Sequence, residues 1–429
     1  MDYEFSKARS LWYAAEPIRR MRHNLKNFTY GKQWETLASR SGVRPTVYES
    51  MMLAGNSMPH NNNLIRPLVK SIVGRFRLNL AEEAPLEGKA AELRDANMLD
   101  ELDTRTLEEF LISGCAIQRL VYERRLAGLR MWVDAVNPDH FFCNRFEDPR
   151  GNDIRTAGML HEMSMPEICL RFAHGSRKRT RELERIFQTA RMSPSTEPGL
   201  LALTQADTIP TQFSVPTDPG LHRVVEVWTL DLVGHRKPTW VGRFYAADGT
   251  LVDQTTSMFP VSSHPFVVTF YPLTDGEIHP FIEDVIDQQR HINLLISTID
   301  KILMHSSKGA LLLPVECQVK GHELYEMAKL WSRPGAVIPY TASRGYEPKE
   351  VNSTTRHEGA YQLLELEMRL FQQISGVSGA LQGQTGGNQM SASLYEAQAT
   401  NSAVALQDVF QTFNSFRRVR TEKALAVLR

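Results

Sequence analysis

Residues 280–303, PFIEDVIDQQRHINLLISTIDKIL, form the segment that most restricts the folds open to this chain. Apolar side chains recur there every three or four residues, which predicts a long amphipathic helix. Pro280 suits the first turn of such a helix, and the carboxylates of Glu283 and Asp284 complement its positive N-terminal end. The apolar face consists of Ile282, Val285, Ile286, Ile292, Leu295, Ile296, Ile299, Ile302 and Leu303.

The side-chain amides of Gln288, Gln289 and Asn293 interrupt this apolar face. In the core of a monomer, each amide would need a buried hydrogen-bond partner. On a helix that packs against copies of itself, amides can instead bridge neighbouring chains and fix their register. The periodicity alone leaves both interpretations open, an ordinary core helix and a helix at a subunit contact.

The composition is that of a soluble globular protein without net charge. The chain has 429 residues, enough for several domains, and 42% of them are hydrophobic. Lys plus Arg and Asp plus Glu each number 49, so any contact with DNA must come from local patches or be weak. The N-terminus lacks the apolar core of a signal peptide, and no apolar run could cross a bilayer. We therefore expect a protein made and kept in the cytosol, with no membrane partner.

The cysteines and carboxylates offer little for chemistry. Cys115, Cys143, Cys169 and Cys317 form no CxxC pair, which predicts free, mostly buried thiols and disfavours a zinc site. The glycine-rich loop 376–387 lacks the Gly-Lys-Ser/Thr ending of a phosphate-binding loop.

The carboxylates between Asp275 and Asp287 are the one candidate for a divalent-metal site. Asp284 and Asp287 are three residues apart on the predicted helix, and Glu277 and Glu283 lie nearby in the sequence. Such a group is typical of a metal-dependent nuclease, although the electrostatics of a helix start explains the same residues. We expect no catalytic residue, no metal and no cofactor, and we keep the virion nuclease as the alternative function.

Elsewhere the chain mixes helices with β-strands. Helical patterns cover 1–35, 64–80, 85–111, 165–191 and 354–374, and a last helix begins near Ser391. A β-hairpin is predicted over 117–136, with its turn near Ala127 and Gly128. Strands dominate 224–270 and predict a small β module.

The predicted helix 165–191 is strongly basic. It carries Arg171, Arg177, Lys178, Arg179, Arg181, Arg185 and Arg191. Glu182 and Glu184 offset part of this charge, which is typical of a solvated helix face. A site for phosphate or for an acidic partner is the more specific interpretation. The following residues, 193–220, are rich in Pro, Thr and Ser and are predicted to form a long loop.

Five short motifs follow one another along nearly the whole chain. They are YGKQW at 30–34, the Asn-led helix from Asn63 to Gly74, the segment 142–166 that ends in MSMPEI, DVIDQQRHINLLIS at 284–297, and the glycine-rich passage 374–393. In this order they resemble the portal proteins of short-tailed and related phages.

The resemblance implies an α+β, mostly helical portal fold with a wing, a two-helix stem, a small β-rich clip and the start of a helical crown. The implied parts are the wing at 1–164, a first stem helix at 165–192, the clip with its preceding loop at 193–270, a second stem helix at 278–305, the wing return and tunnel helix at 306–375, and the crown region at 376–429. The residues expected at subunit or channel contacts are Arg179, Arg185, Asp284, Gln289 and Asn293. Because the final helix has no stop signal, we expect the crown to be truncated or short.

The resemblance also implies a ring, typically of twelve subunits, at one vertex of the capsid. Double-stranded DNA would pass through this ring during packaging and ejection. The implied protein partners are the major capsid protein, the terminase large subunit, which supplies the ATP hydrolysis, and a head–tail adaptor protein. The protein would be assembled in the host cytoplasm and reside in the virion.

Overall fold

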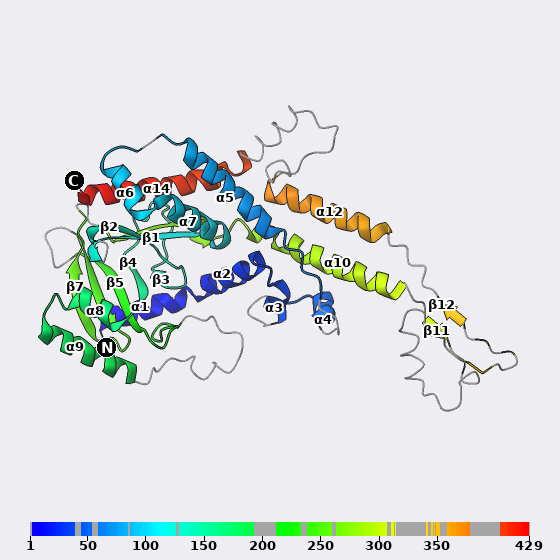
Figure 1. The fold of residues 1–429 in the computed structure, drawn as a ribbon, viewed down its shortest axis with the longest axis horizontal. Helices are drawn as coiled ribbons and strands as arrows, with labels where there is room; N and C mark the ends of the chain where they lie inside the picture. Colours follow the sequence, from blue (N-terminus) through cyan, green and yellow to red (C-terminus); the bar gives the residue numbers. More distant parts are fainter. Residues whose placement is uncertain are drawn as a thin grey trace. The chain divides into compact units, whose positions relative to one another are not determined.

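The computed structural model describes residues 2–38, 44–53, 59–84, 86–125, 128–192, 212–232, 238–259, 263–306, 310–312, 314, 340–341, 345, 347, 349–351, 358–377 and 404–428. The chain divides into two compact units. Unit 1 comprises Met1–Thr46, Asn61–Gln289 and Phe371–Arg429, and unit 2 comprises Val47–His60 and Arg290–Leu370. Helices and strands are both abundant (Figure 1), so the predicted α+β, mostly helical class is confirmed.

Unit 1 holds most of the regular structure. Its helices are α1 (Tyr3–Ala14), α2 (Glu16–Thr29), α3 (Gln33–Ala38), α5 (Ile65–Glu82), α6 (Lys89–Asn97), α7 (Leu99–Ser113), α8 (Met165–Phe172), α9 (Arg177–Met192) and α14 (Gln407–Leu428). Its strands are β1 (Cys115–Arg125), β2 (Gly128–Ala135), β3 (Phe141–Cys143), β4 (Thr156–Met163), β5 (His222–Asp231), β6 (Thr239–Ala246), β7 (Leu251–Thr256), β8 (Phe266–Phe270), β9 (Pro272–Thr274) and β10 (Glu277–Ile278).

Two antiparallel sheets organise unit 1. The first has the strand order β2-β1-β8, and the second has the order β3-β4-β5-β6-β7. Strands β1 and β2 form the predicted hairpin, with Arg125 opposite Gly128 next to the turn. The two strands are confirmed, because apolar, β-branched and aromatic residues on either side of a glycine favour paired strands; Ala127 of the predicted turn lies outside the described residues.

The strands of 224–270 do not form a module of their own, and this prediction is wrong. Strand β5 pairs along its length with β4, from Thr156 opposite Thr229 to Met163 opposite His222. Strand β8 joins the other sheet through β1, with Cys115 opposite Phe270. Pairing with β4 covers the edge that β5 would otherwise leave open, while β7 and β8 are edge strands of their sheets.

The basic segment 165–191 is two helices, not the single helix predicted. Helix α8 begins at a capping box formed by Ser164 and Glu167, and α9 begins at Arg177 after a break. His174 and Gly175 both have positive φ in that break, a conformation that ends a helix. Both helices bury apolar side chains against the five-stranded sheet (Figure 1), among them Ile168, Phe172, Leu183 and Phe187.

The last helix, α14, packs inside unit 1 and does not form a region apart. Phe413 stacks its ring edge on Phe76 of α5, with ring centroids 5.4 Å apart, and lies 5.8 Å from the ring of Phe110 on α7. Tyr271 Oη donates a hydrogen bond of 2.9 Å to Asp408. Helix α14 therefore shares the core of unit 1; residues 378–403 lie outside the described residues, and a crown region at 376–429 stays a prediction.

The segment 280–303 begins its helix later than predicted. A 3-10 turn (η2, Glu283–Val285) precedes α10 (Ile286–Ser306). Unit 2 contains α4 (Val47–Leu53), the strands β11 (Ala310–Leu312) and β12 (Lys349–Val351), most of α10 and most of α12 (Glu358–Ser375). Helix α12 confirms the predicted helix 354–374 within a few residues at its start.

The described cysteines are free thiols. Burial raises the pKa of Cys115 and of Cys143 to about 12, and burial also raises the pKa of Cys169. The prediction of free thiols is confirmed for these three residues, and Cys317 lies outside the described residues.

Candidate functional site

Unit 2 is built around a pair of helices. His291 of α10 and Glu367 of α12 approach within 2.9 Å, Nδ1 to Oε1. Beyond the two helices, β11 and β12 pair antiparallel, with Ala310 opposite Val351. The chain therefore runs out along α10 and returns along α12, which lies beside it (Figure 1).

The other side of α10 is held by Glu49 of α4 and by His60. Arg290 makes two hydrogen bonds, of 3.0 and 2.8 Å, with the buried carboxylate of Glu49 on α4. The backbone N–H of His60 donates to Ser297 Oγ at 2.9 Å, and its ring lies 3.2 Å from Asp300. These contacts cover one face of α10 inside unit 2.

Helix α12 exposes large apolar side chains. Leu366 is 51% exposed, Tyr361 47%, Met368 45% and Leu363 38%. Single exposed apolar residues are ordinary, but these four form two pairs at helical spacing. Tyr361 and Met368, seven residues apart, share one side of the helix. Leu363 and Leu366, three residues apart, share another side. Two exposed apolar pairs on different sides of one helix are candidate contacts with two other molecules.

The amides of Gln289 and Asn293 are buried within the chain's own fold, so the prediction that they lie at a subunit or channel contact is wrong. Gln289 is 2% exposed; its Oε1 accepts from the backbone N–H of Leu64 at 2.8 Å, and its Nε2 donates to the carbonyl of Asn62 at 2.6 Å. Asn293 has no exposed surface. Gln289 thereby satisfies backbone groups just before α5, which is the role an amide needs in a core.

The three charged residues predicted at subunit or channel contacts have different surroundings. Arg179 is half-buried, donates a hydrogen bond to the carbonyl of Val252 on β7, and pairs with Glu182 at 2.8 Å. Arg185 and Asp284 are exposed. Arg179 is thus committed to holding α9 on the sheet, whereas Arg185 and Asp284 stay predicted contacts.

The carboxylates between Asp275 and Asp287 do not converge. Asp275 lies in the turn between β9 and β10, while Asp284 and Asp287 lie at and just after the 3-10 turn. His279 is 3.6 Å from both Glu277 and Glu283, and all three side chains are largely exposed. Throughout the part of the chain that the structure describes, there is no group of three His, Cys, Asp or Glu residues arranged to hold a metal ion. The geometry gives the nuclease alternative no support.

A buried charge cluster joins the two sheets of unit 1. Glu226 on β5 has no exposed surface and lies 3.0 Å from Arg119 Nε on β1. It also accepts hydrogen bonds from Trp228 Nε1 at 2.7 Å and from His161 Nε2 at 2.5 Å. Burial by itself would raise the pKa of Glu226, but the charge of Arg119 and the bond with His161 hold it far below its usual value. The carboxylate is therefore ionised and links β1, β4 and β5.

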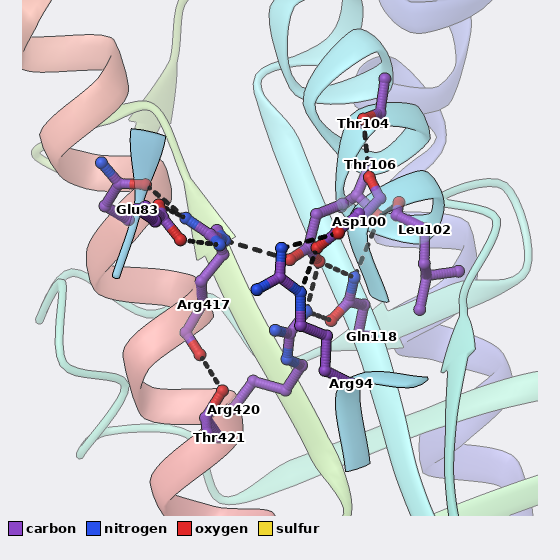
Figure 2. A network of polar contacts seen from close by, with 12 residues as sticks. Glu83, Arg94, Asp100, Leu102, Thr104, Thr106, Gln118, Arg417, Arg420 and Thr421 are labelled. Carbon is purple, nitrogen blue, oxygen red and sulfur yellow. Dashed lines mark hydrogen bonds and ion pairs between the residues drawn. The ribbon is translucent and has the colours of Figure 1, made fainter. Parts of the chain in front are cut away.

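A second charge cluster fixes α14 to the rest of unit 1. Asp103 on α7 is 1% exposed and accepts hydrogen bonds from Arg417 Nε at 3.0 Å, from Arg420 Nη1, and from Gln118 Nε2 at 3.2 Å. Figure 2 shows Arg417 and Arg420 reaching from α14 toward Gln118. Arg417 also pairs with Glu83 at 2.7 Å. The carboxylate of Asp103 thus binds arginine side chains that lie more than 300 positions later in the chain.

The sequence pattern did not reveal either cluster. Arg119 and Glu226 each interrupt an apolar strand, AIQRLV and VVEVW. A charged residue at an inward position of a strand predicts a buried partner, and this signal was available for the pair. Nothing in the sequence near Asp103 indicates that its partners lie on the last helix.

Residues 131–429 match the family model described as Phage P22-like portal protein. No curated protein matches the chain. Among the helices that the structure describes, none has the length and apolar character needed to cross a membrane.

Proposed function

Because the chain belongs to the phage P22-like portal protein family, whose model covers more than half of it, we propose that it forms the ring-shaped channel through which double-stranded DNA is packaged and ejected. Portal proteins are structural components of the virion capsid. We infer a ring of twelve subunits that contacts the major capsid protein, the terminase large subunit and a head–tail adaptor protein. The family match supports the portal role, and these finer features are our proposal.

We infer that α10 and α12 form the stem of this ring, in place of the basic segment 165–192. The two helices run side by side and are joined in sequence by residues 307–357, which we assign to the clip. Helices α8 and α9 pack on the five-stranded sheet of unit 1, which favours a place in the wing for them. Unit 1 as a whole would then be the wing.

The two exposed apolar pairs of α12 are the observation that carries this proposal. In a ring, each subunit presents one face to each of its two neighbours. The pair Tyr361 and Met368 and the pair Leu363 and Leu366 give α12 an apolar surface for each neighbour. Burying each pair between neighbouring stems would remove these apolar side chains from water.

Combining Leu363→Asp and Leu366→Asp in one variant is expected to abolish ring assembly, because each subunit contact would then bury two unpaired charges. Native mass spectrometry and negative-stain images would show rings for the unaltered chain and single subunits for the double variant. The matched control is Gln362→Asp, an exposed polar position on the same helix, which should leave rings intact. Rings of normal size from the double variant, or no rings from the unaltered chain at any concentration, would contradict the proposal.

A further inference from the structure

Helix α9 carries a row of basic side chains on the face that points away from the five-stranded sheet. Its opposite face buries Leu183, Phe187 and Ala190 among residues of α8 and β5 to β7. This packing fixes the rotation of the helix. The outward positions are Arg177, Lys178, Arg181, Glu182, Glu184, Arg185, Gln188 and Thr189, all exposed.

The row is regular. Arg177, Arg181 and Arg185 are four residues apart, so successive guanidinium groups start about 6 Å apart along the helix axis. Lys178 lies beside them on the same face. The whole chain has no net charge, so this helix, with six basic and two acidic residues, is a local departure from the average.

The outward basic groups are not used within the subunit. Arg179 and Arg191 on the same helix are engaged, with Glu182 and with the carbonyl of Pro219 respectively. By contrast, the side chains of Arg177, Lys178, Arg181 and Arg185 have no ion pair or hydrogen bond with any other residue that the structure describes. A stable subunit does not require these four charges, which leaves them available to a partner.

The kind of partner follows from what the outward face lacks. It has no apolar or aromatic side chain, whereas the cores of protein–protein contacts are enriched in such residues. Interfaces with nucleic acid are instead polar and positively charged. Arginine is the residue whose planar fork fits two phosphate oxygens at once. These features favour a phosphate backbone over an acidic protein surface.

We propose that Arg177, Arg181 and Arg185, with Lys178 beside them, bind the phosphate backbone of double-stranded DNA without regard to sequence. This inference rests on the proposed function, which brings DNA to the protein. Three phosphate contacts give an affinity that falls steeply with salt, by roughly 40-fold between about 50 and 200 mM. Such a contact guides DNA without retaining it.

The test is a measurement of DNA affinity as a function of salt. Fluorescence anisotropy with a labelled duplex of about 30 base pairs, titrated at several NaCl concentrations, gives the slope of log K against log salt. In the variant R177Q/R181Q/R185Q, this slope should become shallower by about 2.7, or 0.9 per lost contact. Glutamine keeps a good helix propensity, so α9 should stay folded, which circular dichroism checks.

The matched control is R20Q/R105Q/R150Q, which removes the same charge from exposed arginines elsewhere in unit 1. Its salt slope should stay that of the unaltered chain. If both triple variants reduced the salt slope equally, the total charge would be responsible. If R177Q/R181Q/R185Q did not reduce the slope, α9 would not be the site. Either result overturns the inference. Unaltered affinity for DNA with strong binding to polyglutamate through α9 would assign the row to an acidic protein instead.

Ring formation, measured on the same samples by native mass spectrometry, separates this inference from the proposed function. R177Q/R181Q/R185Q should form rings as well as the unaltered chain does. Rings that bind DNA independently of α9 overturn only the inference about α9. DNA binding through α9 by a chain that never forms rings overturns the channel and leaves the inference standing.

Discussion

Replacing Glu226 with alanine is expected to lower the free energy of unfolding by about 3–5 kcal/mol, because it leaves the buried charge of Arg119 with only the more distant Asp134, 3.9 Å away and partly exposed. Arg119 is 3% exposed, so water cannot take the place of the carboxylate. His161 and the indole N–H of Trp228 would also lose their acceptor. Urea unfolding followed by circular dichroism would measure the change.

A double variant distinguishes the broken charge pair from a general packing defect. When Arg119→Met and Glu226→Leu are combined, both charges are replaced by apolar side chains of similar size, and such replacements are often close to neutral. We therefore expect the double variant to be more stable than Glu226→Ala alone. If the double variant were the less stable of the two, the loss would come from packing, and the charge pair would not be the cause.

The same cluster should make the protein sensitive to acid. The pKa of Glu226 is lower in the folded chain than in the unfolded chain, so its stabilising contribution is present above the ordinary pKa of a glutamate and is lost as pH falls through the folded value. Burial lowers the pKa of His161, so the unfolded chain takes up this proton first and stability begins to fall below about pH 6.5. Because Glu226→Ala keeps His161, the difference in stability between the unaltered chain and the variant should shrink only below the ordinary pKa of a glutamate, about 4.3, where the unfolded chain takes up the Glu226 proton.

Local patterns in the sequence predicted local structure well. The strands β1 and β2 follow from two strand-forming runs on either side of a glycine, and α12 follows from its apolar spacing. The family was also recognisable from the order of short motifs, although no single motif is specific. These features depend on residues close together in the chain.

Predictions failed where distant segments decide the structure. The strands of 224–270 were expected to pair among themselves, but β5 pairs with β4, across the two helices α8 and α9, and β8 pairs with β1. Gln289 was expected at a surface because its buried partners, near Asn62 and Leu64, lie more than 200 residues earlier in the chain. An amide on an apolar helix face predicts that a partner exists, but not whether the partner belongs to the same subunit.

Removal of the Asp103 carboxylate is expected to have a comparably large effect, centred on the last helix. In Asp103→Ala, Arg417 and Arg420 of α14 lose a shared acceptor, and Arg420 is 3% exposed. Loss of one partner from a buried pair costs about 3–5 kcal/mol. Because the aromatic contacts of Phe413 remain, we expect the end of α14 beyond Arg417 to open before the rest of unit 1. Hydrogen exchange should then show faster exchange at residues 418–428 than in the unaltered chain.

Asp100 supplies the control, since it lies on the same helix and also pairs with an arginine. Its partner is Arg94, at 2.7 Å, but its side chain is 51% exposed. Exposed ion pairs contribute only about 0–1 kcal/mol, because water solvates either charge once the pair is broken. Asp100→Ala should therefore leave stability and the exchange of α14 almost unchanged. Equal effects of the two substitutions would show that burial does not set the strength of this cluster, and α14 would then be held by its phenylalanines alone.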